Sequence, residues 1–293
     1  MLLFPYSADV PIYRWPIANF CLIGVLVLAF LVETLLPEQD LEAFILQGWN
    51  PTGILGHMWF HVSLVHLVGN CIFLWVFGNA VSAKIGNGRF ILAYLGFGLV
   101  GALTHLVTDG RPAVGASGAI NGIVGLYLTL YPTNQISCFF FILFRFGTFS
   151  VSGFWMILIW FAFDVVGAIR GGGSAAYQAH LGGFAAGCAL GYLMLRKGLV
   201  EMSPTEKSIL DVLGRRPKER PSGARTEAVA PTRTAAPQSP RRAPLDSRPV
   251  DQPWVTVRCE CGRLWRIPAK HAGKRFRCAS CSALLEVREA ERP

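Results

Sequence analysis

Residues 114–131 read VGASGAINGIVGLYLTLY, a stretch in which one serine, Ser117, lies among glycines and alanines at the start of an apolar run. Small residues let membrane helices approach one another closely, and a serine there can simply hydrogen-bond to a neighbouring helix. The same small residues could instead clear space around a nucleophile. The stretch indicates a tightly packed membrane helix, and the rest of the chain must decide between the two roles of Ser117.

The composition around this stretch is typical of a membrane protein. The chain has 293 residues, 52% hydrophobic and 15% charged, whereas soluble domains carry roughly 25% charged residues. Charged residues are sparse in residues 17–195 and crowded in residues 196–293, so the net charge of +9 mostly belongs to the C-terminal third. A basic segment after the last membrane span is typical of a cytoplasmic tail near anionic lipid.

Six apolar segments are candidate membrane spans, of which the fourth is short for a bilayer. They are residues 17–36, 63–81, 90–107, 117–131, 150–169 and 175–195. We expect a further apolar run, residues 136–146, to lie at the membrane interface or to extend the fifth span. The first segment has the length of a span rather than of a signal-peptide core, so no cleavable signal is predicted. The predicted fold is an all-α, multi-pass membrane bundle of six transmembrane helices.

Basic residues orient the six spans. With the N-terminus inside, the inner side carries Arg14, Lys84, Arg89, Arg145, Arg196 and Lys197. The outer side carries Arg111 and Arg170. The positive-inside rule therefore predicts cytoplasmic N- and C-termini, and we expect an integral protein of a bacterial inner membrane.

The composition changes beyond the sixth span. Residues 215–250 are rich in Pro, Arg, Ala and Ser with almost no large apolar residue, which predicts a disordered linker over residues 201–252. A second unit, residues 253–293, begins with the alternating apolar residues of WVTVRCECGRLWRI. The predicted organisation is a membrane domain over residues 1–200, the linker, and a small C-terminal domain.

Three of the spans carry polar side chains, which are costly in lipid and therefore mark a candidate functional site. His66 and Asn70 are four residues apart in the second span, so they share one helix face. Ser117 begins the fourth span, and His180 lies near the start of the sixth. The predicted orientation puts all four at a similar shallow depth on the outer side. Helix–helix hydrogen bonds explain each residue singly, but they do not explain the shared depth.

These side chains fit acyl transfer. A serine hydroxyl needs a base to take its proton, and neutral histidine is the usual one. Asn70, a histidine N–H and the backbone N–H of Ser117 could donate hydrogen bonds to the developing oxyanion. No third acid is obvious, because Asp109 lies in the loop before Ser117 and Asp164 lies deep in the fifth span, near its middle or outer half. The sequence therefore favours a two-residue dyad over a triad.

Three motifs, HVSLVHLVGN, GASGAINGIVG and AHLGGFAAG, resemble the signatures of the rhomboid intramembrane serine proteases, in the same order, across about residues 15–197. The resemblance implies a rhomboid-like bundle that cuts membrane-protein substrates within or beside their transmembrane helices. It implies Ser117 as the nucleophile and His180 as the general base. The supporting residues that it implies are His66 and Asn70 at the oxyanion, Gly115 before the nucleophile, and His61, which organises the site.

The resemblance has further consequences and two departures. Gly183 and Gly187 would let the sixth span pack closely on the fourth, and the glycines at 171–173 would form a mobile flap over the site. Asn121 stands where the family usually has an aromatic that stacks on the catalytic histidine. Trp49-Asn50 stands where a Trp-Arg pair is usual. Two more histidines match no motif and are interpreted as structural: His57 and His105.

The C-terminal unit contains two close cysteine pairs in a CxC-x16-CxxC pattern. Such pairs fit a tetrahedral four-cysteine site for structural Zn²⁺ in a small β zinc ribbon, with the ligands Cys259, Cys261, Cys278 and Cys281. Structural disulfides are the alternative, which a cytoplasmic location disfavours. We expect a cytoplasmic partner for the ribbon; its arginines alone do not predict nucleic-acid binding. No cofactor is expected for proteolysis.

Two functions of different classes stay open. One is an intramembrane serine endopeptidase, with membrane-protein substrates and the lipid bilayer as its partners. The other is a catalytically inactive rhomboid-like protein that binds membrane clients without cutting them. The presence of Ser117, His180, His66 and Asn70 favours the enzyme, while Asn121 leaves the alternative open. A transporter would need a charged or broken-helix site at the membrane midplane, which the sequence does not suggest.

Overall fold

The computed structural model describes residues 2–142, 145–171, 175–215, 254–259, 264–268, 273, 275–277 and 284–286. The chain divides into two compact units, Met1–Ala224 and Arg225–Pro293.

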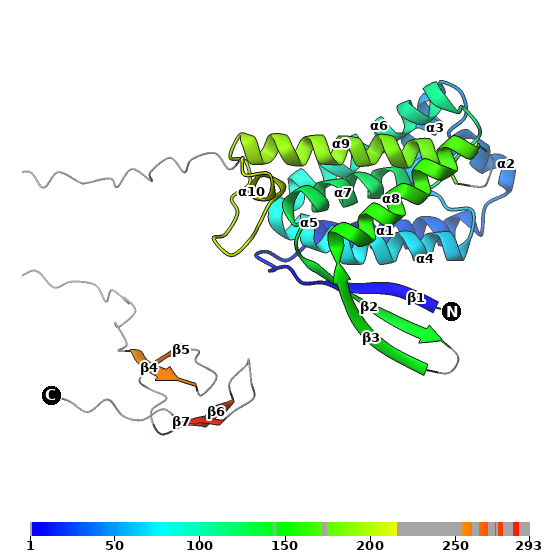
Figure 1. The fold of residues 1–293 in the computed structure, drawn as a ribbon. Helices are drawn as coiled ribbons and strands as arrows, with labels where there is room; N and C mark the ends of the chain where they lie inside the picture. Colours follow the sequence, from blue (N-terminus) through cyan, green and yellow to red (C-terminus); the bar gives the residue numbers. More distant parts are fainter. Residues whose placement is uncertain are drawn as a thin grey trace, which may run out of the picture. The chain divides into compact units, whose positions relative to one another are not determined.

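The first unit is a bundle of apolar helices that run alternately in opposite directions (Figure 1). A helix covers each of the six predicted apolar segments. These helices are α1 (Ile17–Glu33), α4 (Leu64–Phe73) with its continuation through the π-helical η3 (Leu74–Gly78) into α5 (Asn79–Ile85), α6 (Asn87–Thr108), α7 (Ser117–Leu130), α8 (Gly153–Arg170) and α9 (Tyr177–Arg196). Among the described residues, three helical stretches have the length and hydropathy of a full membrane span: Leu64–Ile85, Asn87–Thr108 and Gly153–Arg170.

The outer faces of these helices are apolar. Leu28 on α1, Leu92 on α6 and Phe163 on α8 expose 61%, 72% and 68% of their surface. A water-soluble domain rarely presents so much contiguous apolar surface. A helix in lipid satisfies its backbone hydrogen bonds internally, and its side chains face lipid, so an apolar outer surface is what a membrane helix requires. The bundle therefore has the surface of a protein that is surrounded by lipid.

Helix α7 lies at the centre of the bundle and packs closely against α9. A Cβ atom on Gly183 would overlap the carbonyl of Gly118, and one on Gly187 would overlap the carbonyl of Gly122. Glycine at these positions lets the two helix backbones touch, which confirms the predicted close packing of the sixth span on the fourth. The contact brings the first turns of α7 and α9 to the same end of the bundle (Figure 1).

The connection from α1 to α4 folds over that same end. It contains α2 (Glu38–Leu41), η1 (Glu42–Phe44), α3 (Pro51–Gly56) and η2 (His57–Trp59). A bridge pairs Leu46 with Ala113, and the backbone N–H of Gly115 donates to the carbonyl of His57 at 2.8 Å. These bonds fix the loop immediately before Ser117.

Residues 136–146 do not extend the helix of the fifth span, so that alternative is wrong, while their location at the membrane interface stays a prediction. Strands β2 (Gln135–Ile142) and β3 (Arg145–Ser152) form an antiparallel hairpin, and β1 (Leu2–Ala8) pairs with the other edge of β2. Aromatic and β-branched residues, which dominate this hairpin, favour strands. Hydropathy alone cannot distinguish a short apolar strand from a helical segment. The first unit is therefore mostly helical rather than all-α.

The packed part of the first unit extends beyond the predicted boundary at residue 200. The side chain of Glu206 lies 2.5 Å from the ammonium of Lys84, and Leu210, in the short helix α10 (Ile209–Val212), is buried. The predicted linker therefore cannot begin at residue 201. Its remainder, residues 216–252, lies outside the described residues.

The second unit contains two antiparallel strand pairs. Strand β4 (Trp254–Arg258) pairs with β5 (Leu264–Pro268), as the alternation in WVTVRCECGRLWRI indicates, and β6 (Arg275–Arg277) pairs with β7 (Leu284–Glu286). Cys259 is buried directly after β4. The other three predicted zinc ligands, Cys261, Cys278 and Cys281, lie outside the described residues, so the zinc site stays a prediction.

Candidate active site

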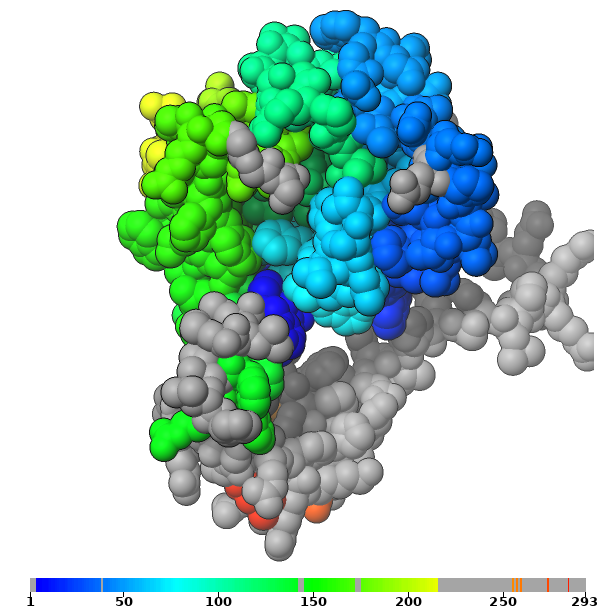
Figure 2. Space-filling view, turned by 90° about the vertical axis from the view of Figure 1, so that its right-hand side faces the viewer, coloured from blue at the N-terminus to red at the C-terminus, as the bar shows by residue number. Residues whose placement is uncertain are grey.

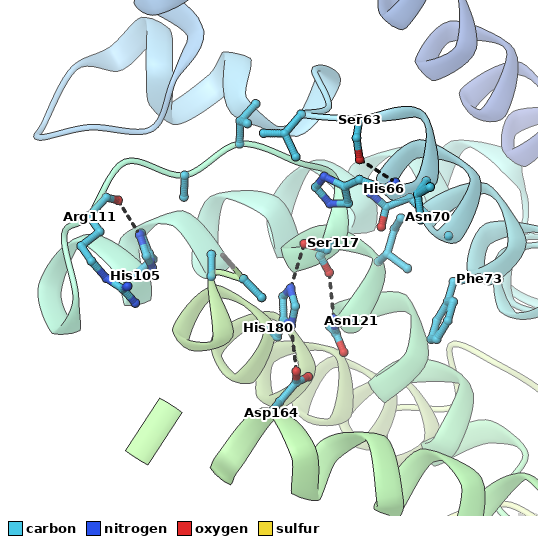
Figure 3. A pocket seen from close by; sticks show the side chains of 18 of the residues that line it. Ser63, His66, Asn70, Phe73, His105, Arg111, Ser117, Asn121, Asp164 and His180 are labelled. Carbon is cyan, nitrogen blue, oxygen red and sulfur yellow. Dashed lines mark hydrogen bonds and ion pairs between the residues drawn. The ribbon is translucent and has the colours of Figure 1, made fainter. Parts of the chain in front are cut away.

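Ser117 and His180 face one another at the end of the bundle. Ser117 is the first residue of α7, and His180 lies in the first turn of α9. The hydroxyl Oγ of Ser117 is 2.8 Å from Nε2 of His180 (Figure 3). When the ring proton is on Nδ1, Nε2 is free to accept the hydrogen of the hydroxyl, which is the arrangement that general-base catalysis requires.

A third polar group continues this line. Oδ1 of Asp164, on α8, lies 3.0 Å from Nδ1 of His180 (Figure 3). An ionised carboxylate only accepts hydrogen bonds, so the proton of the ring must be on Nδ1. The histidine and aspartate side chains are 14% and 17% exposed, so the pair is largely shielded from water.

The sequence predicts a dyad with no acid nearby, but the structure has the carboxylate of Asp164 next to His180. The sequence indicates how far along the fifth span Asp164 lies. It does not indicate on which side of the helix its side chain lies, or which neighbouring helix that side faces. The signal was present, because an ionisable residue within a membrane span marks a candidate functional site.

The second acid considered from the sequence, Asp109, has other partners. Arg111 donates to it from Nε at 2.6 Å and from Nη2 at 2.8 Å. These hydrogen bonds hold the pKa of Asp109 below its usual value, against a smaller opposing effect of burial. His105 donates from Nε2 to the carbonyl of Arg111 at 2.8 Å, which agrees with its interpretation as structural.

A cavity of about 890 Å³ opens beside the serine. Figure 2 shows this end of the bundle hollowed between α4 and α8. The cavity has apolar walls from these two helices, including Phe73 and Trp160. Its polar lining includes the residues that the sequence singled out, together with the acid: His66, Asn70, Ser117, Asp164 and His180. Ser63, His105, Arg111 and Asn121 also line it.

Two of these residues, His66 and Asn70, come from one face of α4, as their spacing predicts. Ser63 caps this helix by accepting a hydrogen bond from the backbone N–H of His66 at 3.2 Å. The amide Nδ2 of Asn70 is buried and has no hydrogen-bond partner among the described residues. A buried unsatisfied donor costs about 1–3 kcal/mol, so this amide is well suited to bind an acceptor that enters the cavity.

Gly115 and His61 shape the surroundings of His66. Gly115 has a φ of 136°, and a Cβ atom there would lie 2.5 Å from Cε1 of His66. Only glycine fits, because both the backbone conformation and the space exclude a side chain. His61 packs edge-on against His66, with ring centroids 5.1 Å apart. Burial lowers the pKa of His61 to about 4, so its ring is neutral at pH 7 and supports its neighbour by packing.

Asn121 does not hold the ring of His180. Its Nδ2 donates to the backbone carbonyl of Ser117 at 3.0 Å. The aromatic neighbour of His180 is Tyr177, which approaches edge-on with ring centroids 6.2 Å apart. The orientation of the histidine therefore depends on other contacts than a stacked aromatic.

Most of the predicted flap lies outside the described residues. Gly171, which follows α8, has a positive φ of 62°. Gly172 and Gly173 lie outside the described residues, so the gating role stays a prediction.

The sequence of this chain is similar to known proteins of one group. A family model described as the Rhomboid domain matches residues 48–197. That range contains every candidate residue of the membrane-domain site and none of the four cysteines predicted to bind zinc.

Three relatives illustrate the similarity. Rhomboid protease GluP of Bacillus subtilis is 40% identical over 75 residues, which are 26% of this chain and 15% of that protein. Rhomboid protein 1, mitochondrial, of Saccharomyces cerevisiae is 30% identical over 147 residues, 47% of this chain and 40% of that protein. Putative rhomboid protease YdcA of Bacillus subtilis is 32% identical over 139 residues, 47% of this chain and 64% of that protein. The chain thus spans less than two thirds of the length of each.

Proposed function

Because the chain belongs to the rhomboid family, we propose that this multi-pass membrane protein is a serine endopeptidase that cuts membrane-protein substrates within or beside their transmembrane segments. The observation that carries the proposal is the 2.8 Å contact between Oγ of Ser117 and Nε2 of His180 in a cavity at the end of the bundle. A serine and a base in hydrogen-bond contact are the minimum for nucleophilic acyl transfer.

The reaction needs no group beyond those at the site. His180 takes the hydroxyl proton as Oγ of Ser117 attacks the scissile carbonyl, and the resulting tetrahedral oxyanion collapses with loss of the amine. The proton held on Nε2 passes to that leaving nitrogen. Water then attacks the acyl-enzyme with the histidine again acting as base, which releases the carboxylate product and restores the serine.

Donors for the oxyanion lie on α4 and at the start of α7. The unpartnered amide of Asn70 lines the cavity with Ser117. The backbone N–H of Ser117 belongs to the N-terminus of α7, where the helix dipole is positive and favours negative charge. His66 lines the same cavity and would add an N–H when its ring presents one.

The substrate must expose an extended peptide. The backbone carbonyls of an intact helix are hydrogen-bonded and shielded, so a transmembrane segment has to unwind before attack. Helix-weakening Gly or Pro near the cut, and a small residue at it, would lower that cost. We further propose that six helices span the membrane with both chain ends in the cytoplasm, as the basic residues indicate.

The C-terminal unit would hold one structural Zn²⁺ through Cys259, Cys261, Cys278 and Cys281. The cysteine spacing, the two strand pairs and the burial of Cys259 support this proposal. The metal would supply folding energy to the small unit and take no part in proteolysis. Metal analysis of the purified full chain should find about one zinc per chain. Cys278→Ser with Cys281→Ser should abolish it, and unchanged zinc would contradict the ligand assignment.

A fluorophosphonate probe tests the proposed protease directly. The detergent-solubilised protein should be labelled at Ser117, and both Ser117→Ala and His180→Ala should abolish labelling and the cleavage of a model transmembrane substrate. Ser63→Ala is a control from the same cavity. The Ser63 hydroxyl accepts a hydrogen bond from the backbone N–H of His66, and no histidine ring nitrogen contacts it among the described residues, so this variant should still be labelled at Ser117. Undiminished labelling or cleavage in Ser117→Ala would reject the assignment and favour the inactive client-binding alternative.

A further inference from the structure

Asp164 is an ionisable residue on α8, one of the three described helical stretches with the length and hydropathy of a membrane span. A carboxylate within a membrane span is costly, so a compensating contact is needed. Among the side-chain hydrogen bonds and ion pairs of the described residues, Asp164 contacts His180 alone.

We propose that Asp164 is a positioning residue that fixes the tautomer and orientation of His180, so that the site works as a Ser–His–Asp triad. This proposal rests on the proposed protease activity and adds a third member to it. The three groups lie in series, with 2.8 Å between the serine and the ring and 3.0 Å between the ring and the carboxylate.

The hydrogen-bond inventory of the three groups gives Asp164 its role. Only the tautomer with hydrogen on Nδ1 can donate to the carboxylate, and that tautomer leaves Nε2 as an acceptor for the hydroxyl of Ser117. The opposite tautomer would present hydrogen to the serine and could not take its proton. When the serine proton arrives on Nε2, the adjacent carboxylate also stabilises the positive ring. The proton then leaves to the amine product, and Asp164 stays ionised throughout.

Among the described residues, no other neighbour of His180 gives its ring equivalent support. Asn121, one turn after Ser117, directs its amide to the Ser117 carbonyl, and Tyr177 touches the ring only edge-on. Neither contact distinguishes the two ring nitrogens. The contact with Asp164 does, so it is the one that selects the reactive tautomer.

Three substitutions of Asp164 separate positioning from general packing. Asp164→Asn should lower both kcat for a model substrate and the maximal rate of fluorophosphonate labelling by about 10²–10⁴-fold, with KM little changed. Asp164→Ala should be less harmful than Asn, because an asparagine amide can donate to Nδ1 and hold the wrong tautomer, whereas alanine imposes none. Asp164→Glu, which restores an acceptor, should recover at least about tenfold over Asn, a difference of about 1.4 kcal/mol in barrier.

Asp109→Asn is the matched control. Its carboxylate also lies near a histidine, with Oδ2 3.9 Å from Nδ1 of His105, but that histidine does not contact Ser117. This variant should label and cleave like the wild type. Thermal unfolding of all variants reports whether the fold is retained.

The outcomes distinguish the two proposals. If wild type is labelled at Ser117 and Asp164→Asn labels at the same maximal rate, the positioning role is wrong and the dyad stands. Equal losses in Asn, Ala and Glu, matched by equal falls in thermal midpoint, would assign Asp164 to packing and also overturn the proposal. If wild type is not labelled at all, the protease proposal fails and the triad fails with it.

Discussion

At the residue scale, the site is distinguished by polar groups whose partners come from different helices. The hydroxyl of Ser117 meets a base from α9, and that base meets an acid from α8. The amide of Asn70 faces the same cavity with no protein partner among the described residues. A buried hydrogen-bond donor without an acceptor lowers the stability of the fold. Such a donor is useful when an acceptor on a bound molecule enters the cavity.

Asn70→Ala should therefore affect the reaction and not the fold. We expect kcat to fall by about 10²–10³-fold, the usual loss for one oxyanion donor, while the thermal midpoint stays at or above that of the wild type. Steady-state cleavage and thermal unfolding of the same preparation measure both. A fall in thermal midpoint with unchanged kcat would show that Asn70 only packs.

At the element scale, two glycines on α9 set how closely the base approaches the serine. The α7–α9 contact is made by backbones at Gly183 and Gly187, so the separation of the two helices leaves no room for a methyl group. Ser117 and His180 lie on the first turns of these helices, so the distance between their side chains depends on the separation of the two helices.

Gly187→Ala should force α9 away from α7 and part the serine from its base. Overpacking of this kind costs about 1–3 kcal/mol, and we expect both a lower thermal midpoint and slower labelling of Ser117. Gly96→Ala on α6 is the control, because a Cβ atom there would meet nothing within 4 Å. Wild-type labelling by Gly187→Ala would mean that the helices can separate without disturbing the site.

The sequence predicts some of these elements and their contacts and not others. A shared depth for His66, Asn70, Ser117 and His180 could be predicted, because spacing and orientation fix depth along a helix, and the cavity that all four line agrees with it. Asp164 was misjudged, because depth does not fix the face that a helix presents to its neighbour. The hairpin at residues 136–146 was missed for another reason: a short apolar run carries no period that separates a strand from a helix. Strand β1 pairs with residues about 130 positions further along the chain, such as Ala8 with Ile136, and local pattern does not predict such a distant partner.

At the scale of the whole membrane domain, residues after α9 fold back onto the end of the bundle away from the site (Figure 1). The ammonium of Lys84 meets the carboxylate of Glu206, with side-chain exposures of 5% and 3%, and it lies 4.5 Å from the ring centroid of Tyr13. Breaking one side of a buried ion pair leaves the other charge without compensation. This segment is therefore part of the domain rather than the start of a tether.

Truncation should distinguish these two descriptions. A chain ending at residue 215 should retain proteolysis and thermal stability, whereas one ending at residue 204 should lose on the order of 3 kcal/mol, because Lys84 stays buried without Glu206. Glu206→Gln should reproduce much of that loss, and Glu201→Gln, at an exposed position, should not. Equal stability of the two truncated chains would contradict a structural role for residues 205–215.

The same pair predicts how stability depends on pH. Burial raises the pKa of Glu206, but hydrogen bonds from Lys84 and from the backbone N–H of Ser203 outweigh it, so the net pKa lies below the usual value. A lowered folded pKa means that the stabilisation is complete above the ordinary glutamate pKa of about 4.3 and is lost as pH falls through the folded value. The stability difference between wild type and Glu206→Gln should shrink over that acidic window. A difference that does not change with pH would rule out this linkage.

Helix α8 is less buried than the other two full-length spans. Only 17% of its span is buried, against 44% for each of the other two full-length spans, α4–η3–α5 and α6. Ser117 and His180 lie on helices that pack closely through glycine contacts. Asp164 lies on the less buried α8, which also forms one wall of the cavity. Any outward movement of α8 would enlarge the cavity and at the same time lengthen the Asp164–His180 contact. In the proposed mechanism, the access of a substrate and the positioning of the base would therefore depend on the same helix.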